Sequence, residues 1–306
     1  MIEVRNLTKR YGDRIAVDDL SFVVEPGIVT GFLGPNGAGK STTMRLIAGL
    51  DRPSGGSVRV NGRYFPGTAA PLAELGILLE AKAVHTGRSA RNHLLALAQT
   101  AGLGRGRVDE LIELVGLGAV AGRRVGGFSL GMGQRLGLAS ALLGRPRTVV
   151  LDEPVNGLDP EGVQWVRELL RSLAEEGRTV FVSSHLMSEM AQTASRLVVV
   201  GRGRLIADCT VEEFVAQTTS SQVTVRTPDP DRLAQRLRAA AGRVRLVAAD
   251  RLEVTGLSTD QIGEIAWQAG LPVLELTRTT ASLEEAFMAA TRDSVDYRTP
   301  AAAAPR

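Results

Sequence analysis

The stretch that decides the fold is Gly34-Pro35-Asn36-Gly37-Ala38-Gly39-Lys40-Ser41-Thr42. It matches the phosphate-loop pattern, in which a glycine and four further residues precede Gly-Lys-Ser. The β-branched, apolar run at residues 28–33 predicts a buried strand before it, and residues 42–49 have the apolar spacing of a helix. A strand, a glycine-rich turn and a helix together direct backbone N–H groups at a polyphosphate. The sequence therefore predicts a nucleotide-binding protein.

Single residues of this loop have separate expected roles. Gly37 and Gly39 let the backbone curl without a Cβ clash. Lys40 is expected to neutralise the β- and γ-phosphates, and the Ser41 hydroxyl to bind Mg²⁺. A glycine-rich turn that fits the pattern by chance is the alternative, and the flanking strand and helix count against it. ATP and Mg²⁺ are therefore the expected cofactors.

Composition limits the class of protein. The chain has 306 residues, 44% hydrophobic and 23% charged, with a formal charge of only +3 from scattered arginines. A nucleic-acid partner is therefore not indicated. The single cysteine, Cys209, cannot form an internal disulfide. The three histidines lie far apart in the sequence and do not have the spacing of a zinc site. A reducing compartment is expected.

No apolar run approaches the roughly 20 residues that cross a bilayer, and the first residues lack the apolar core of a signal peptide. The expected location is the cytoplasm. If the protein acts on a membrane, another chain must supply the spanning helices.

The pattern along the chain predicts two domains and a tail. Buried strands are expected at residues 28–33, 76–79, 148–151, 179–183 and 197–200, with helices between them, which indicates an α/β domain with a largely parallel sheet. This domain is expected to cover residues 1–218. Residues 219–292 follow a βαββαβ order, typical of a small ferredoxin-like α+β domain, and residues 293–306 are expected to be disordered. Asp229, Asp231 and Asp260 fall at expected helix starts, where capping is their expected role.

Two carboxylates follow the buried run at residues 148–151. Asp152 is expected to hold Mg²⁺, and Glu153 to orient and deprotonate the attacking water. Ligands of open α/β sheets lie at this end of the strands. An Asp-Glu pair in an ordinary loop is the alternative, which the phosphate loop earlier in the chain counts against.

The stretch Phe128-Ser129-Leu130-Gly131-Met132-Gly133-Gln134-Arg135 precedes another apolar helix pattern. With it, the chain from Met1 to about Asp208 resembles the ATP-binding cassette family, the nucleotide-binding subunits of ABC transporters. The family's other motifs appear in order: Tyr11, where an aromatic residue stacks on adenine, then Gly157-Leu158-Asp159, and His185 after a strand. The resemblance implies a RecA-like α/β core with an antiparallel β subdomain and a helical subdomain.

The resemblance also implies a dimer with two ATP molecules between the subunits. Ser129 and Gly131 of one subunit would close on the γ-phosphate held by Lys40 of the other, where a hydroxyl, a bare N–H and a helix N-terminus favour negative charge. His185 would contact the same phosphate and help to place the water, and Asp159 would link the two sites. Without the resemblance, Ser129 is a plain helix N-cap and His185 a strand-end histidine.

The chain departs from the family pattern at two places. Leu130 and Met132 flank Gly131, where the usual signature has adjacent glycines after the serine; this variant is similar to drug-export and ABC-2-type cassettes. Glu80 stands where the family has a glutamine that contacts Mg²⁺, in a loop that meets the membrane partner. The residues around Glu80 resemble the daunorubicin-resistance type of exporter cassette. Glu80 as an ordinary solvated loop residue is the alternative.

The expected function is ATP hydrolysis by a homodimer, or by a pair with a paralogue, that drives a separate ABC-2-type permease from the inner face of the membrane. Export of a hydrophobic small molecule such as an antibiotic is the expected task. The alternatives are a regulatory or resistance cassette that switches a soluble partner, and a cassette that acts on ribosomes or DNA. The latter usually has two cassettes or a coiled-coil insert, which this chain lacks, and no guanine-reading Asn-Lys-X-Asp motif indicates a GTPase. The C-terminal domain is expected to serve dimer contact or regulation.

Overall fold

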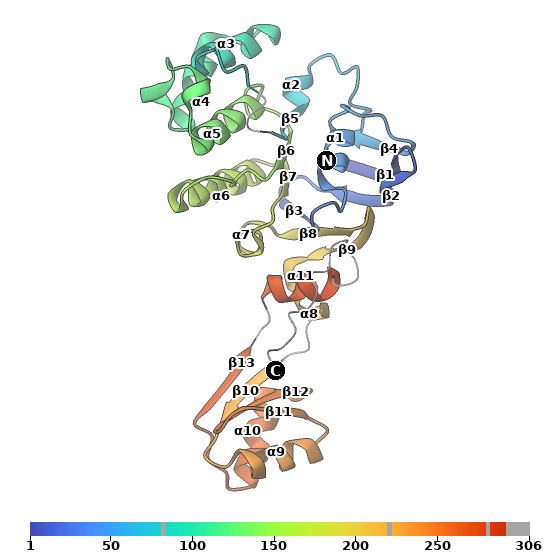
Figure 1. The fold of residues 1–306 in the computed structure, drawn as a ribbon, viewed down its shortest axis with the longest axis vertical. Helices are drawn as coiled ribbons and strands as arrows, with labels where there is room; N and C mark the ends of the chain where they lie inside the picture. Colours follow the sequence, from blue (N-terminus) through green and yellow to red (C-terminus); the bar gives the residue numbers. More distant parts are fainter. Residues whose placement is uncertain (81–83, 219–221, 280–281, 292–306) are drawn as a thin grey trace, which may run out of the picture. The chain divides into compact units, whose positions relative to one another are not determined.

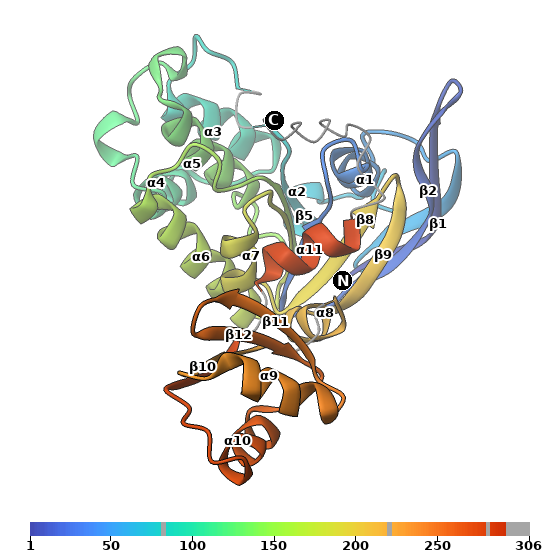
Figure 2. The same cartoon turned by 60° about the horizontal axis from the view of Figure 1, so that its bottom comes forward.

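The structure, a computed structural model, describes residues 1–80, 84–218, 222–279 and 282–291. It divides into two units, Met1–Thr210 and Val211–Ala290, whose elements Figures 1 and 2 show from two directions. The helix at residues 211–218 groups with the second unit. The domain boundary expected after residue 218 stays a prediction. The tail expected at residues 293–306 lies outside the described residues.

The first unit alternates strands and helices. Its strands are β1 (Ile2–Tyr11), β2 (Arg14–Val24), β3 (Val29–Leu33), β4 (Gly55–Val60), β5 (Leu75–Leu78), β6 (Thr148–Asp152), β7 (Thr179–Ser183), β8 (Arg196–Gly201) and β9 (Arg204–Thr210). Its α-helices are α1 (Lys40–Ile47), α2 (Pro71–Glu74), α3 (Ala90–Thr100), α4 (Arg105–Leu114), α5 (Leu130–Ala141), α6 (Pro160–Glu175) and α7 (Met187–Thr193), and two 3₁₀ turns lie at Gly118–Val120 and Val125–Gly127.

Six strands form the main sheet in the order β5-β6-β7-β3-β8-β9. All neighbours pair in parallel except β8 and β9, which form an antiparallel hairpin. The strands β6, β7 and β3 are almost wholly buried, as expected for strands with helices on both faces. The prediction of an α/β domain with a largely parallel sheet is confirmed.

A second, antiparallel sheet has the order β2-β1-β4. Three phenyl rings join it to the main sheet: Phe22 of β2 packs against Phe32 of β3 and Phe181 of β7, with ring centroids 4.9–5.8 Å apart. The rings are buried, and aromatic pairs at this spacing contribute about 0.5–1.5 kcal/mol each beyond the area that they bury. They join the two sheets in one hydrophobic core.

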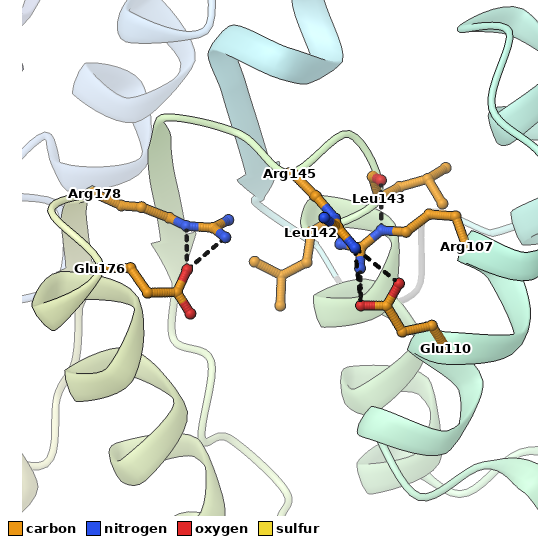
Figure 3. Close-up of polar contacts among 7 residues, drawn as sticks. All are labelled: Arg107, Glu110, Leu142, Leu143, Arg145, Glu176 and Arg178. Atoms are coloured by element: carbon orange, nitrogen blue, oxygen red, sulfur yellow. Dashed lines mark hydrogen bonds and ion pairs between the residues drawn. The ribbon is translucent and has the colours of Figure 1, made fainter.

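Helices α3, α4 and α5 form a helical region on the other side of β5 from α1 (Figures 1 and 2). Arg107 of α4 fixes the C-terminal end of α5, because its Nε donates to Leu143 O (3.1 Å) and its Nη2 to Leu142 O (2.6 Å). Glu110, one turn further along α4, accepts hydrogen bonds from Arg107 and from the more exposed Arg145 (Figure 3). The last carbonyls of a helix have no partners within it, so Arg107 serves as their cap.

The second unit contains α8 (Val211–Thr218), β10 (Gln222–Arg226), α9 (Pro230–Ala239), β11 (Arg243–Ala248), β12 (Arg251–Thr255), α10 (Thr259–Gln268), β13 (Glu275–Thr279) and α11 (Leu283–Thr291). Its four strands pair antiparallel in the order β11-β12-β10-β13, the order of a split-βαβ sheet. A core that includes Val225, Leu233, Val254 and Ile262 lies between the sheet and its helices.

Three aspartates of this unit were expected to cap helices, and one of them does so. Asp229 caps α9 by accepting the N–H of Arg232 (3.3 Å). Asp231 and Asp260 lie in the first turns of α9 and α10, and Ser258 caps α10. In the described residues, no helix is both long and apolar enough to cross a membrane.

Candidate functional site

The phosphate loop connects the carboxyl end of β3 to the start of α1, as the sequence predicts. Gly39 has φ +98°, and a Cβ there would lie 2.4 Å from the carbonyl oxygen of Ala16, so only glycine fits. The loop lines a pocket of about 400 Å³ together with Tyr11, Arg14 and Ala16. Tyr11 therefore lies where a base bound beside the loop could stack.

Lys40 is half-buried at the base of this loop. Its Nζ donates to the carbonyl oxygens of Gly34 (2.6 Å) and Pro35 (3.3 Å). Burial lowers the pKa of the Lys40 ammonium, and the charges of Glu153 and Asp152 partly oppose this. Burial disfavours a lone cation, so a polyphosphate anion in the pocket would stabilise it.

The Tyr11 ring is half-exposed. Its hydroxyl donates to Asp51 Oδ2 (3.1 Å), and the ammonium of Lys9 lies 4.8 Å from its ring centroid. Burial, followed by the hydrogen bond with Asp51, raises the pKa of the Tyr11 hydroxyl. The ring is thus held at the pocket through its hydroxyl group and by Lys9 over one face.

Asp152 ends β6 beside the phosphate loop. Its Oδ2 accepts the Ser41 hydroxyl (2.7 Å) and its Oδ1 accepts the Ser183 hydroxyl. Ser183 is opposite Asp152 in the β6–β7 register. The structure therefore brings together Ser41 and Asp152, the two residues expected to hold Mg²⁺, although they are 111 positions apart.

Glu153 has a left-handed backbone, with φ +51°. Such a conformation costs a non-glycine residue about 1–3 kcal/mol and persists only where its surroundings hold it. Its N–H donates to Ser183 Oγ (3.0 Å), and its carbonyl oxygen accepts from Gln134 Nε2 (2.9 Å) and from the N–H of Asn156 (3.2 Å).

His185 meets the side chain of the same residue. The distance from His185 Nδ1 to Glu153 Oε2 is 2.6 Å, and the His185 N–H donates to this oxygen at 3.2 Å. An ionised carboxylate only accepts hydrogen bonds, so with Glu153 ionised Nδ1 donates in this contact and Nε2 is left for another partner. About half of the His185 side chain is exposed.

Ser129 and Gly131 lie apart from the phosphate loop of their own chain. Ser129 caps α5 by accepting the N–H of Met132 (3.2 Å) and lines a different pocket, next to Thr86 and Val125. A Cβ on Gly131 would lie 3.0 Å from the carbonyl oxygen of Gly157, so glycine lets α5 approach that segment closely. In Figure 1, α5 and α1 lie on opposite sides of β6.

Asp159 and Glu80 complete the predicted set. Asp159 caps α6 by accepting the N–H of Gly162 (3.0 Å). Glu80 is exposed, two residues beyond the end of β5, the strand that pairs with β6. It therefore lies at the same edge of the sheet as Asp152, and its part in Mg²⁺ binding stays a prediction.

Two residues of this site, Ser183 and Gln134, have no role predicted from the sequence. Ser183 was expected only as a strand residue, although its place at the end of β7 signals a neighbour of the acid pair. Gln134 stands within the quoted signature stretch without an assigned role, and its bond to Glu153 joins positions 19 apart. Both are buried.

The chain is similar to known protein families. The family described as "ABC transporter" matches residues 17–156, and a domain of unknown function (DUF8746) matches residues 221–284. The bacitracin transport ATP-binding protein BcrA of Bacillus licheniformis is 41% identical over 211 residues, which are 68% of this chain and 69% of that protein. The Nod factor export ATP-binding protein I of Burkholderia orbicola is 33% identical and covers 94% of this chain and 95% of its own length.

Solved structures have the same fold. An ATP-binding subunit of an ABC transporter, 26% identical, matches with a TM-score of 0.66 over 71% of this chain and 92% of its own length. The dimeric, post-hydrolysis structure of the cassette MJ0796 bound to ADP and Pi, 23% identical, matches with a TM-score of 0.63 over 69% and 98%. This chain belongs to the ATP-binding subunits of ABC transporters, and its first unit is their ATPase domain.

Proposed function

We propose that the chain binds ATP along residues 34–42, with Tyr11 on the adenine, and that Glu153 is the base that activates the attacking water. One observation carries this proposal: the contacts Ser41–Asp152 and Glu153–His185 gather at the carboxyl ends of β6 and β7, beside the phosphate loop. This is the edge of an open α/β sheet where ligands bind.

The donor set fits Mg²⁺. The Ser41 hydroxyl and the Asp152 carboxylate are oxygen ligands 2.7 Å apart, and Mg²⁺ prefers oxygen ligands supplied together with substrate phosphates. Glu80 is a third candidate ligand. Mg²⁺ would supply neutralising charge to the phosphates at this site.

The side chains of the site have separate proposed roles in ATP hydrolysis. Lys40 would leave the carbonyls of Gly34 and Pro35 for the β- and γ-phosphates. Glu153 would accept the proton of the water, and His185, held through Nδ1, would direct Nε2 at the γ-phosphate. Ser41, Asp152 and Ser183 would hold the metal-binding edge in place.

Ser129, Gly131 and Asp159 fit a site shared by two copies. Ser129 and Gly131 lie away from the Lys40 of their own chain, at the start of α5, where Ser129 is exposed and Gly131 half-buried. A second cassette facing the first would place them on the bound γ-phosphate, with Asp159 between the two sites. A homodimer is the simplest such assembly.

The chain would drive a separate ABC-2-type permease from the inner face of the membrane. The related ATP-binding proteins are named for bacitracin transport, lantibiotic transport and Nod factor export. Export of a hydrophobic small molecule or antibiotic is therefore the proposed task. Dimer contact or regulation is proposed for the second unit.

Purification of the tagged chain from membranes of its own host tests this function. A chain with several spanning helices should copurify and raise the ATPase rate after reconstitution. In the same preparation Glu153→Gln should retain the partner and ATP, trap a dimer and lose at least about 99% of turnover, as expected when a general base is removed. Ribosomal or DNA-repair partners without a membrane protein would contradict the transport function, and wild-type turnover by Glu153→Gln would contradict the assignment of the base.

A further inference from the structure

The backbone of Glu153 is held from both sides of its Cα. Its N–H bond to Ser183 Oγ fixes the peptide before the residue and hence φ, whereas the bonds to its carbonyl oxygen fix the following peptide and hence ψ. These two angles set the direction of the Cβ and therefore of the carboxylate. The unusual φ of +51° makes this restraint necessary.

Two donors share the Glu153 carbonyl oxygen. The N–H of Asn156 belongs to the same turn, at 3.2 Å, whereas Gln134 Nε2 comes from α5 at 2.9 Å. Gln134 is only 4% exposed. Its amide links α5, the helix that follows Ser129 and is called the signature helix below, to the acid pair Asp152-Glu153. Ser183 and His185 both come from β7 or the residues just after it, so among these contacts Gln134 is the link to the helical region.

We propose that Gln134 is a positioning residue for the Glu153 carboxylate. The inference rests on the proposed role of Glu153 as the base. The Gln134 amide holds the 153–154 peptide in the orientation that points the Glu153 side chain at His185. Gln134 touches no reacting atom and acts only through this peptide.

Gln134 lies on the same helix, α5, that Ser129 caps. It lies five residues after Ser129, or about 7.5 Å along the helix axis. One rigid helix therefore carries the residue proposed to meet the partner's nucleotide and the residue that aligns this chain's own base. A shift of α5 is thereby transmitted to the Glu153 peptide.

Two substitutions distinguish the loss of the Gln134 Nε2 donor from a change in the shape of the side chain. Gln134→Met keeps the length and removes the donor, and Gln134→Glu keeps the shape but presents oxygens to a carbonyl oxygen. Both should lower kcat for ATP at least tenfold and leave KM within about twofold, because the loop and Tyr11 are unchanged. Ser140→Ala is the matched control: its hydroxyl lies on the same helix and donates only to Leu136 O (2.9 Å), so kcat should stay at the wild-type value.

A pH series distinguishes positioning from plain structural support. A buried carboxyl has a raised pKa, and once protonated it can donate to the Glu153 carbonyl as the amide does. The kcat of Gln134→Glu relative to wild type should therefore rise as pH falls, while the ratio for Gln134→Met stays flat. Gln134→Met has the same Asp152, Glu153 and His185 and no added carboxyl, so it is the reference for the pH series.

The outcomes are separable from those for the proposed function. Wild-type kcat in Gln134→Met, or a flat ratio for Gln134→Glu, would overturn the positioning role while Glu153→Gln remains inactive. Equal turnover in wild type and Glu153→Gln would instead remove the proposed base. A crystal structure of Gln134→Met, or of Gln134→Glu if the first does not fold, decides independently of turnover: a displaced Glu153 carboxylate supports the role, and an unchanged φ and His185 contact overturn it.

Discussion

At the scale of single residues, the site depends on a few side chains whose partners fix their chemistry. Asp152 accepts one hydroxyl at each carboxylate oxygen, so its orientation is fixed before any ligand binds. Glu153 contacts Nδ1 of His185 and thereby orients the imidazole ring. Pre-organisation of this kind lowers the cost of binding, because fewer rotamers are lost when the ligand arrives.

Tyr11 provides the residue-scale prediction. Tyr11→Ala should weaken ATP binding about tenfold, because stacking of a base on an aromatic ring contributes about 1–3 kcal/mol and 1.4 kcal/mol is a factor of ten. Tyr11→Phe is the matched control, since it keeps the ring and removes only the hydroxyl bond to Asp51. Titration calorimetry with the Mg²⁺ complex of ATP measures both, and equal affinities for the alanine variant and the wild type would exclude the stacking role.

At the scale of elements, α5 is fixed at both ends. Ser129 caps its N-terminus and Arg107 its C-terminal carbonyls. The apolar spacing of the sequence predicted helices in this region, and the serine before the pattern indicated the N-cap. The arginine cap was not predictable, because Arg107 and Leu142 are 35 positions apart.

Arg107→Met should lower the free energy of unfolding by about 1–3 kcal/mol, because it removes a charged donor from two carbonyls of α5. For a domain of this size that corresponds to a loss of at least about 2–4 °C in Tm. Arg145→Met is the control: Arg145 is largely exposed and pairs only with Glu110 among the contacts in Figure 3, so the change should stay within about 0.5 kcal/mol. Thermal unfolding with nucleotide absent measures both, and equal losses would contradict the capping role of Arg107.

At the scale of the whole molecule, the phosphate loop and α5 of the first unit are each proposed to form half of a nucleotide site. The phosphate loop and the signature helix line different pockets. A two-fold dimer that joins the loop of one copy to the signature helix of the other would complete both sites.

Mixing two inactive variants tests this assembly. Lys40→Ala and Ser129→Arg should each be inactive alone, but a mixed dimer retains one site with an intact Lys40 and an intact Ser129. Random mixing should restore about a quarter of wild-type turnover, because half of the dimers are mixed and each has one of two sites intact. Two tags confirm that mixed dimers form. No recovered activity in purified mixed dimers would show that the site lies within one chain.

The sequence alone determined the phosphate loop, the acid pair after β6 and the order of strands and helices. These features depend on neighbouring residues: turn glycines, apolar periodicity and caps act over a few positions, and the α/β class follows from their alternation. Even there the ends shifted, since a strand was expected at residues 76–79 and β5 runs over Leu75–Leu78.

Only the tertiary structure decided which side chains meet at the site. Ser183 reaches Asp152 because the β6–β7 register places them side by side, and Gln134 reaches the Glu153 carbonyl because α5 packs beside that turn. Register and helix packing are set by burial of the whole core, and no local pattern encodes them. The left-handed backbone of Glu153 belongs to the same class: glutamate has no local preference for it, and hydrogen bonds from distant parts of the chain impose it.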